Sequence, residues 1–352
     1  MKVGIMGFAR SGKTTVFNAL TGAQAAVGAF GSRDANMAVL KVPDERVDHL
    51  ETIHKPKKKT YAEFEFVDVP PNESTTDEKA LDSAALNHLR TVDALVHVVR
   101  CFEKEEVVHP LGGVDAVRDC KAMEEEFQFA DLIVIEKRIQ RLEKEKKLEM
   151  EYDVLAKCQE RVEGGGAIRG MELTAQEWQA IVGYGFLSQK QVMLLGNFGE
   201  DAIGDSDPSG LSAYAAEHDT TLVELCGAME LEVGELPEEE RQAFRDGLGL
   251  GDESRVAFLK SAYEKLGLIS FLTAGDPEVR AWTIRRGTKA LDAAGVVHSD
   301  IKRGFIRAET VAYDDFVAAG SMAKAKEAGR VRLEGKDYEV QDGDIILFRF
   351  NV

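Results

Sequence analysis

The 352-residue sequence has few cysteines, few prolines and no long apolar run. Its four cysteines lie far apart with no C-x-x-C pair, which argues against both a zinc site and a disulfide framework. A content of 8 prolines and 44% apolar residues is typical of a folded globular protein. No stretch approaches the roughly 18 consecutive apolar residues of a membrane span. A strand-like segment follows Met1 directly, without a basic leader, so we expect a cytoplasmic protein with no membrane partner.

An excess of positive charge is also missing, since the formal net charge is −18. Proteins that bind nucleic acid by neutralising phosphates need concentrated Lys and Arg, so we expect no sequence-specific DNA binding. Residues 268–352 carry 13 basic and 13 acidic side chains, which leaves the whole excess of negative charge in residues 1–267. The C-terminal segment is therefore the part that an RNA-rich partner would repel least.

The most informative motif is Gly-Phe-Ala-Arg-Ser-Gly-Lys-Thr at residues 7–14, a complete G-x-x-x-x-G-K-[ST] phosphate loop. An apolar run precedes it and a helix-like stretch follows, which is the context that such a loop requires. Its backbone amides would surround phosphate oxygens at the positive end of the helix dipole. Lys13 would reach the β and γ phosphates, and Thr14 would coordinate Mg²⁺. The alternative is a glycine-containing turn that carries Lys and Thr by chance.

Strand-like and helix-like segments alternate through the first two thirds of the chain, as in a doubly wound α/β domain. The pattern predicts strands at 3–7, 64–69, 95–99, 192–195 and 221–225, and helices that include 14–20, 78–89 and 237–248. We expect a discontinuous nucleotide-binding domain of residues 1–123 and 191–266. The length of the chain likewise favours two or three domains over one.

Residues 124–190 are predicted to form a helical coiled-coil insertion in this domain. Between residues 124 and 163 apolar side chains recur at spacings of three and four, which describes a stripe on one long helix with a break after Leu142. Three glycines at 164–166 end it, and residues 174–183 read as the returning helix. The alternative is an ordinary solvated helix pair without a binding role.

The character of the sequence changes after Gly267, where β-branched and aromatic residues alternate with polar ones. Asp342-Gly343-Asp344 is a turn signal before a last strand at 345–350. Residues 267–352 therefore predict a β-rich domain of ordinary size. His298 and Asp300 in this region are interpreted as structural or solvated groups rather than as a catalytic pair.

The end of the fourth predicted strand indicates which base is read. Residues 197–200 read Asn-Phe-Gly-Glu where guanine-binding relatives of phosphate-loop proteins carry N-K-x-D. In that motif the Asp accepts hydrogen bonds from two guanine donors, a pairing that adenine cannot make. Glu200 is longer than Asp, and Phe198 replaces the Lys that flanks the ring, so adenine is favoured. The alternative is that Asn197 only begins a loop.

Asp68 is the predicted carboxylate on the metal side of the site. It ends an apolar strand, as expected of the residue that holds Mg²⁺ through water at the tip of a strand. The alternative is a strand-terminating Asp at a turn before Pro70 and Pro71.

With these motifs the chain resembles the YchF/Obg-like ATPases, a branch of the translation-factor-related P-loop NTPases. The likeness is most specific in the C-terminal segment, which is similar to the TGS domain of that family. The matching stretches there are 271–275, 278–283, 304–309, 312–313, 327–329, 333–338, 340–344 and 348–352. Residues 17–21, 42–44 and 97–102 also fit, so the resemblance spans nearly the whole chain.

The resemblance implies a G domain interrupted by a coiled-coil hairpin and followed by a TGS domain, which is β-grasp-like. It implies hydrolysis of ATP in preference to GTP, and association with ribosomes. The family's N-x-x-E base motif falls on Asn197 and Glu200, and its second base-contacting loop falls on residues 226–228. The candidate nucleotide-binding residues are thus Ala9, Arg10, Ser11, Gly12, Lys13, Thr14, Thr15, Asn197, Phe198, Glu200, Cys226 and Gly227. Lys13 is the candidate catalytic residue.

Departures from the family pattern lie where hydrolysis is controlled. Arg10 and Ser11 stand where the family has Asn and Val, and the first-switch Thr corresponds to Ser32, which joins Thr14 and Asp68 as a candidate metal ligand. In the second switch Pro71 replaces a glycine, which removes an amide that would contact the γ phosphate. Arg10 could supply a positive charge there instead.

Three hypotheses follow from the sequence. The first is an ATP-hydrolysing switch whose two switch loops order on ATP·Mg²⁺ and whose hairpin and C-terminal domain report that state to the ribosome. The second is a non-catalytic, nucleotide-gated binding module, because the second switch is altered. The third is a GTPase that prefers GTP.

Overall fold

The computed structural model describes residues 1–351 except 23–35, 70–80, 147–148, 203–208 and 249–253. The chain divides into two compact units. Unit 1 comprises Met1–Val39 and Glu65–Arg255, and unit 2 comprises Leu40–Phe64 and Val256–Val352. The C-terminal domain predicted from the sequence therefore groups with residues 40–64, and the helical insertion groups with the nucleotide-binding domain. The boundaries at 123, 190 and 266 remain predictions.

The phosphate loop follows a strand of a six-stranded sheet, whose strands lie in the order β2-β4-β1-β5-β6-β7. Its strands are β1 (Lys2–Met6), β2 (Asn36–Val42), β4 (Ala62–Asp68), β5 (Ala94–Cys101), β6 (Val192–Phe198) and β7 (Thr221–Leu225). β1 pairs in parallel with β4 and β5, and β6 pairs in parallel with β5 and β7. Every strand predicted for this domain is present. Their carboxyl ends meet at one edge, where such sheets bind ligands.

The helices α1 (Lys13–Thr21), α3 (Ser83–Arg90) and α4 (Ala116–Glu145) connect these strands. A buried cluster that includes Phe8, Leu89 and Leu95 packs α3 and the first half of α4 against strand residues. α1 instead contacts α8 (Gly227–Glu235), the helix that follows β7. A second buried cluster joins the start of α4 to α7 (Leu211–Glu217).

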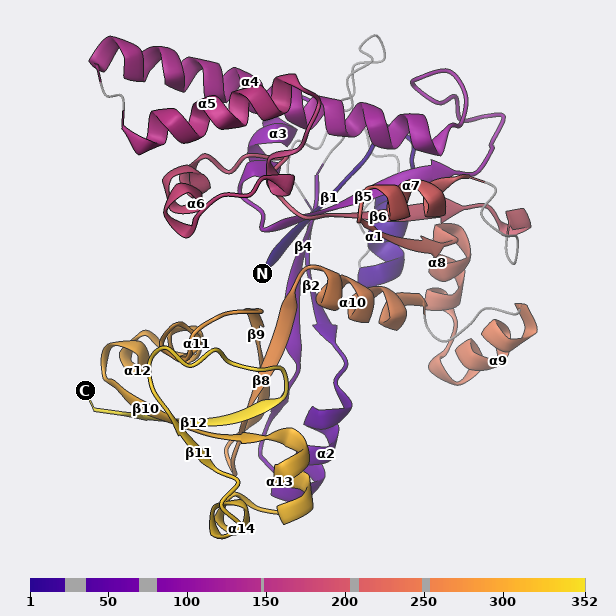
Figure 1. Ribbon diagram of the computed structural model, residues 1–352. Coiled ribbons are helices and arrows are strands. Elements are labelled where there is room, and N and C mark those ends of the chain that lie inside the picture. Colours follow the sequence, from indigo (N-terminus) through magenta and orange to yellow (C-terminus); the bar gives the residue numbers. More distant parts are fainter. Residues whose placement is uncertain (23–35, 70–80, 147–148, 203–208, 249–253, 352) are drawn as a thin grey trace. The chain divides into compact units, whose positions relative to one another are not determined.

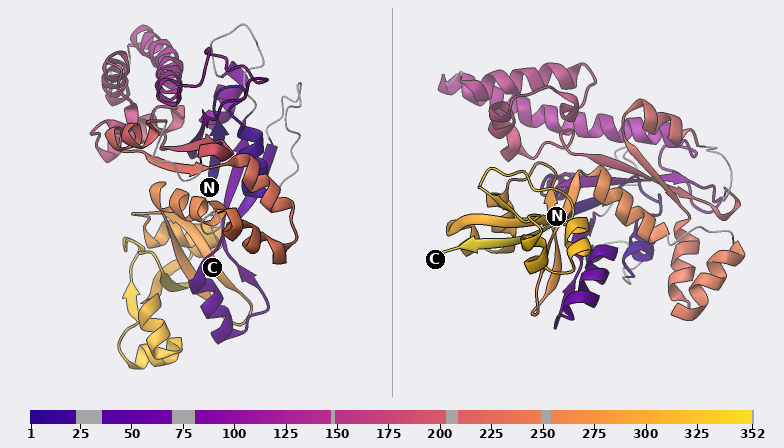
Figure 2. Two further views of the ribbon diagram at one scale, coloured as in Figure 1. Left: turned by 90° about the vertical axis from the view of Figure 1, so that its right-hand side faces the viewer. Right: turned by 60° about the horizontal axis from the view of Figure 1, so that its bottom comes forward.

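The helical insertion differs in detail from its prediction. The stripe was predicted on one long helix, but α4 ends at Glu145, where Lys146 adopts a left-handed backbone with φ 54°. A second helix, α5 (Met150–Glu163), returns beside α4, and Figures 1 and 2 show the two side by side from every direction drawn. The predicted returning helix is α6 (Ala175–Ile181), which begins at a Thr174 capping box and packs on α5. The apolar stripe thus lies on both arms of a hairpin, because a chain that turns back buries it against itself.

Asp131 anchors this hairpin to the rest of unit 1. Its side chain is fully buried on α4 and accepts hydrogen bonds from the Leu187 and Ser188 amides at 2.9 and 2.8 Å. Arg90, at the end of α3, donates to the same carboxylate at 3.0 Å. Although burial raises the pKa of Asp131, these donors favour its charged form.

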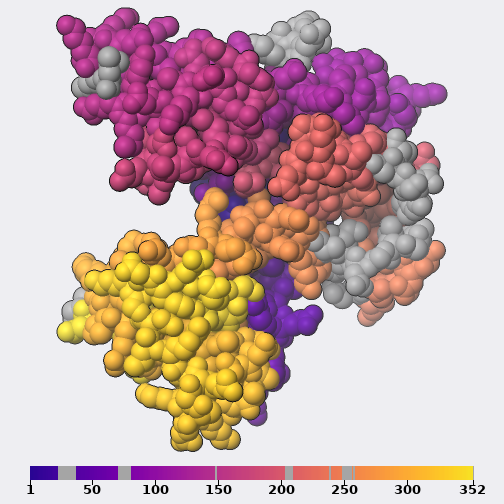
Figure 3. Space-filling model, in the orientation of Figure 1, coloured from indigo at the N-terminus to yellow at the C-terminus, as the bar shows by residue number. Residues whose placement is uncertain are grey.

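Unit 2 contains a mixed six-stranded sheet in the order β11-β10-β12-β8-β9-β3. Its strands are β3 (Lys59–Thr60), β8 (Leu268–Ala274), β9 (Val279–Arg285), β10 (Phe305–Ala312), β11 (Arg332–Glu334) and β12 (Asp344–Phe350). The predicted β-rich domain is confirmed, and the turn at Gly343, with φ 80°, precedes β12 as expected. The sequence did not predict that β3 and α2 (Glu45–His54) complete it. Figure 3 shows the purple atoms of this segment against orange and yellow atoms of the C-terminal residues.

The remaining helices lie between the strands. They are α9 (Glu238–Leu248), α10 (Ser254–Lys265), α11 (Ala290–Val297), α12 (Ser299–Arg303), α13 (Tyr313–Ala319) and α14 (Met322–Glu327), with 3-10 turns at Ile168–Gly170, Val182–Tyr184 and Glu200–Ala202. Among the described residues no helix combines the length and the apolar character needed to cross a bilayer.

Candidate nucleotide-binding site

The phosphate loop connects β1 to α1 and has the backbone that its glycines allow. Gly12, the N-cap of α1, has φ 86°, and Arg10 also adopts a left-handed conformation with φ 64°. A Cβ atom on Gly12 would collide with the Asn197 amide, and one on Gly7 would collide with the Val98 carbonyl. These two positions therefore need glycine both for conformation and for space.

The first amides of α1 are available to an anion. Among the described residues, no hydrogen bond from the amides of Gly12, Lys13 or Thr14 is formed, although Ser11 donates to the Phe8 carbonyl at 3.3 Å. The Ser11 hydroxyl is buried as well, and no described residue forms a hydrogen bond with it. Such a cluster of free donors at a helix N-terminus is the arrangement that binds phosphate.

Lys13 is held over this loop. Its ammonium group is buried and donates to the carbonyls of Gly7 and Phe8 at 2.8 and 3.1 Å. Burial lowers the pKa of Lys13 to about 8, and the nearby Asp68 carboxylate opposes this shift. A desolvated cation at this place gains strongly from a polyanionic ligand.

Thr14 and Asp68 meet beside the loop, as the sequence predicted for the metal side. The Thr14 hydroxyl donates to Asp68 Oδ2 at 3.4 Å, and Asp68 is buried at the end of β4. Ser32, the third predicted metal ligand, lies outside the described residues, as does Pro71 of the second switch.

Asn197 joins the phosphate loop to the segment after β7. Its Nδ2 donates to the Ser11 carbonyl at 3.0 Å, and its Oδ1 accepts from the Gly227 amide at 3.0 Å. The side chain is buried at the end of β6. The interpretation of Asn197 as the mere start of a loop does not describe this arrangement, because the side chain spans two segments that are 30 or more residues away in sequence.

The other base-side candidates lie near Asn197 with different exposure. Phe198 and Cys226 are buried, whereas Glu200 is exposed at the start of a 3-10 turn. Burial raises the pKa of the Cys226 thiol. Ala9 and Thr15 lie in the loop and in the first turn of α1 and are partly exposed. Arg10 is exposed, and its guanidinium donates to the Val108 carbonyl at 3.0 Å.

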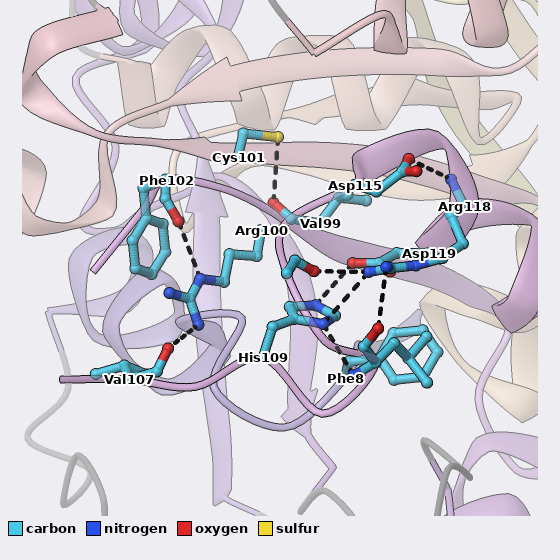
Figure 4. Close-up of polar contacts among 12 residues, drawn as sticks. Phe8, Val99, Arg100, Cys101, Phe102, Val107, His109, Asp115, Arg118 and Asp119 are labelled. Carbon is cyan, nitrogen blue, oxygen red and sulfur yellow. Dashed lines mark hydrogen bonds and ion pairs between the residues drawn. The ribbon is translucent and has the colours of Figure 1, made fainter. Parts of the chain in front are cut away.

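The structure adds a polar network that the sequence did not reveal (Figure 4). His109 Nε2 lies 2.8 Å from Asp119 Oδ2, and Nδ1 of the same ring accepts from the Leu111 amide at 3.1 Å. Arg118 also binds the Asp119 carboxylate, at 2.8 Å, and donates to the Gly113 carbonyl at 2.8 Å. The network fixes the connection between β5 and α4, and the His109 ring lies 6.2 Å from that of Phe8.

His97, which lies on β5 opposite Met6 of β1, is another buried group in this region. Its Nε2 has no hydrogen-bond partner within the part of the chain that the structure describes, and burial lowers its pKa to about 4. Within the described residues, no group of three or more His, Cys, Asp or Glu side chains is arranged to hold a metal ion.

A parallel sheet with a glycine-bounded phosphate loop, a buried lysine and a Thr–Asp pair defines a P-loop nucleoside triphosphatase. Residues 2–137 match the family model described as 50S ribosome-binding GTPase. Residues 268–351 match the model of the YchF-type GTPase C-terminal domain, which is described as a protein of unknown function.

Whole-length relatives identify the family. The chain is 40% identical over 366 residues to the ribosome-binding ATPase YchF of Bacillus subtilis, with 100% of each chain covered. It is 36% identical to Obg-like ATPase 1 of Gallus gallus, with 100% of this chain and 92% of the relative covered. The solved structure of the Schizosaccharomyces pombe YchF GTPase superposes with a TM-score of 0.82 at 29% identity, over 99% of this chain and 97% of that one. The chain therefore belongs to the YchF/Obg-like ATPase family of nucleotide hydrolases, as the resemblance predicted.

Proposed function

We propose that the chain is a switch that binds and hydrolyses ATP, with GTP used less well. The observation that carries this proposal is the buried Lys13 ammonium in the same loop as amides that have no acceptor among the described residues. When a triphosphate binds, the Lys13 ammonium would donate to phosphate oxygens in place of the Gly7 and Phe8 carbonyls. Lys13 would then stabilise the charge that develops on the transferred phosphoryl group, which makes it the catalytic residue of the site.

Mg²⁺ fits the oxygen donors beside the loop. A threonine hydroxyl and a carboxylate 3.4 Å apart are the ligand types that Mg²⁺ takes together with substrate phosphates and water. When bound, the ion would neutralise charge on the β and γ phosphates. We propose Thr14 and Asp68 as the residues on its side of the nucleotide, with Ser32 of the first switch as a further ligand.

We propose that the base is read by Asn197, Phe198, Glu200, Cys226 and Gly227. Asn197 uses both ends of its amide within the protein, so its proposed part is to hold the phosphate loop and residue 227 in register. Glu200 is the carboxylate of this set, and its side chain is exposed. Its extra methylene relative to Asp disfavours the paired contact that guanine requires.

Relatives named as ribosome-binding ATPases support a ribosomal partner. We propose that this chain also associates with ribosomes in the cytoplasm. The hairpin of α4 and α5 and the β-rich unit would present the nucleotide state. Within unit 1, α4 of the hairpin packs on α3, so the hairpin is connected to the nucleotide-binding domain through this helix.

Calorimetric titration with ATP and with GTP in Mg²⁺, followed by product analysis, tests the proposal. We expect tighter binding of ATP and the appearance of ADP. Binding without product would favour the non-catalytic, nucleotide-gated module, and preferred binding of GTP would refute the base assignment. Absence of binding by either nucleotide would contradict the proposal altogether.

A further inference from the structure

Arg100 is a buried cation whose guanidinium contacts backbone carbonyls and an aromatic ring. It lies on β5 with an exposed fraction of 1%. Among the residues that the structure describes, no carboxylate forms an ion pair with it; Glu103 and Asp119 act only at longer range. Burial lowers the pKa of Arg100, because desolvation disfavours its charged form. A buried charge without a paired carboxylate is unfavourable for folding, so the residue is better explained by what it holds than by a gain in stability.

Arg100 holds the segment that leaves β5 (Figure 4). Its Nε donates to the Phe102 carbonyl at 3.0 Å and its Nη1 donates to the Val107 carbonyl at 2.8 Å. The guanidinium also lies 4.6 Å from the centre of the Phe102 ring, within cation–π distance. One side chain therefore fixes both the backbone and the ring of Phe102.

Phe102 borders the two segments that we assign to the nucleotide. Its Cε1 would lie 3.8 Å from a Cβ atom on Gly12 in the phosphate loop, and its Cβ would lie 3.5 Å from one on Gly199 in the base-reading segment. The residue is only partly buried. A nucleotide that contacts both the phosphate loop and residues 197–200 would therefore have its sugar or base beside the Phe102 ring.

We propose that Arg100 is a positioning residue of the nucleotide site, which acts through Phe102 on the nucleoside part of the ligand. This inference rests on the proposed nucleotide-binding function. Lysine could not replace arginine here, because an ammonium group has no flat face that could stack on the Phe102 ring while its hydrogens bind the two carbonyls.

Calorimetry with two ligands separates positioning from general damage. ATP carries a nucleoside, whereas inorganic triphosphate offers the phosphate loop the same anion without one. We expect Arg100→Lys to weaken ATP binding about 10-fold and to leave inorganic triphosphate binding within about 2-fold of wild type. Phe102→Leu, which leaves both carbonyls available to Arg100, should reproduce this split. The double variant should lose little more than Phe102→Leu alone, because the two residues act as one unit.

The outcomes are distinct. Equal weakening for both ligands by Arg100→Lys, or unchanged ATP binding by Phe102→Leu, would overturn the proposal. If Arg100→Lys does not fold, Phe102→Leu decides alone by the same split between ligands. Failure of wild type to bind ATP at all would instead refute the proposed function. Arg138→Lys is the control, because Arg138 lies on α4, where it binds Glu151, and has no part in the proposed nucleotide site. It should not produce the ATP-specific loss, and if it does, Arg100 has no special role.

Discussion

Replacing Asn197 with alanine should weaken both the fold of unit 1 and its nucleotide site. The side chain makes two buried hydrogen bonds, each 3.0 Å long, to the Ser11 carbonyl and from the Gly227 amide. A buried polar group left without its partner costs roughly 1–3 kcal/mol, so two of them predict a loss of about 2–6 kcal/mol. Since Ser11 is part of the phosphate loop, the affinity for ATP should fall as well.

Urea unfolding measures the loss of stability, and hydrogen exchange at the Gly227 amide locates it. We expect a lower unfolding midpoint and faster exchange at that amide, by a factor of about 5 or more for each 1 kcal/mol lost locally. Asn351→Ala is the control, because that side chain is exposed near the C-terminus and should change stability by less than about 0.5 kcal/mol. A change below about 0.5 kcal/mol for Asn197→Ala, with unchanged exchange at Gly227, would refute the reasoning.

Three further predictions concern the same region. Because the pKa of Lys13 is lowered to about 8, a bound triphosphate should raise it, so ATP binding near pH 8.5 should take up protons; calorimetry in buffers of different ionisation enthalpy measures this, and no uptake would contradict it. Burial lowers the pKa of His97 to about 4, so the native state disfavours its protonation. As the pH falls from about 6.5 to about 4, stability should therefore decrease by up to about 3 kcal/mol. Urea midpoints across this range should depend less on pH in His97→Leu, and an unchanged profile would exclude this cause. Gly12→Ala should abolish ATP binding, because its Cβ would collide with the Asn197 amide at a left-handed φ of 86°; wild-type affinity in a titration would contradict that.

The sequence predicted the nucleotide-binding domain well because its signals are local. The phosphate loop must occupy consecutive residues, and the buried parallel strand β6 begins with a continuous apolar run. The partnership of Thr14 with Asp68 could also be inferred, since both follow from the carboxyl edge of such a sheet.

The sequence shows an interruption of the apolar stripe after Leu142, but helix propensity does not predict that the helix ends at Glu145. Residues 143–151 are almost all good helix formers, so local preference favours continuing the helix through Lys146. Burial of the apolar stripe of α4 against that of α5 outweighs this preference, and a left-handed residue at 146 is the result.

Contacts that depend on tertiary folding were missed for a similar reason. β3 and α2 join the C-terminal strands across more than 200 residues of sequence, and nothing in residues 45–60 indicates that partner. Arg100 lies in an apolar strand in the sequence, and only the course of the chain after β5 shows that its donors meet the carbonyls of Phe102 and Val107.

Release of inorganic phosphate from ATP by the full-length chain in Mg²⁺, compared between wild type and Lys13→Ala, tests the central claim most directly. The account predicts steady turnover by wild type and none above background for the variant, because the lysine that binds the Gly7 and Phe8 carbonyls without ligand is the one that must meet the γ phosphate. Equal turnover by the two proteins, or none by wild type, would contradict it.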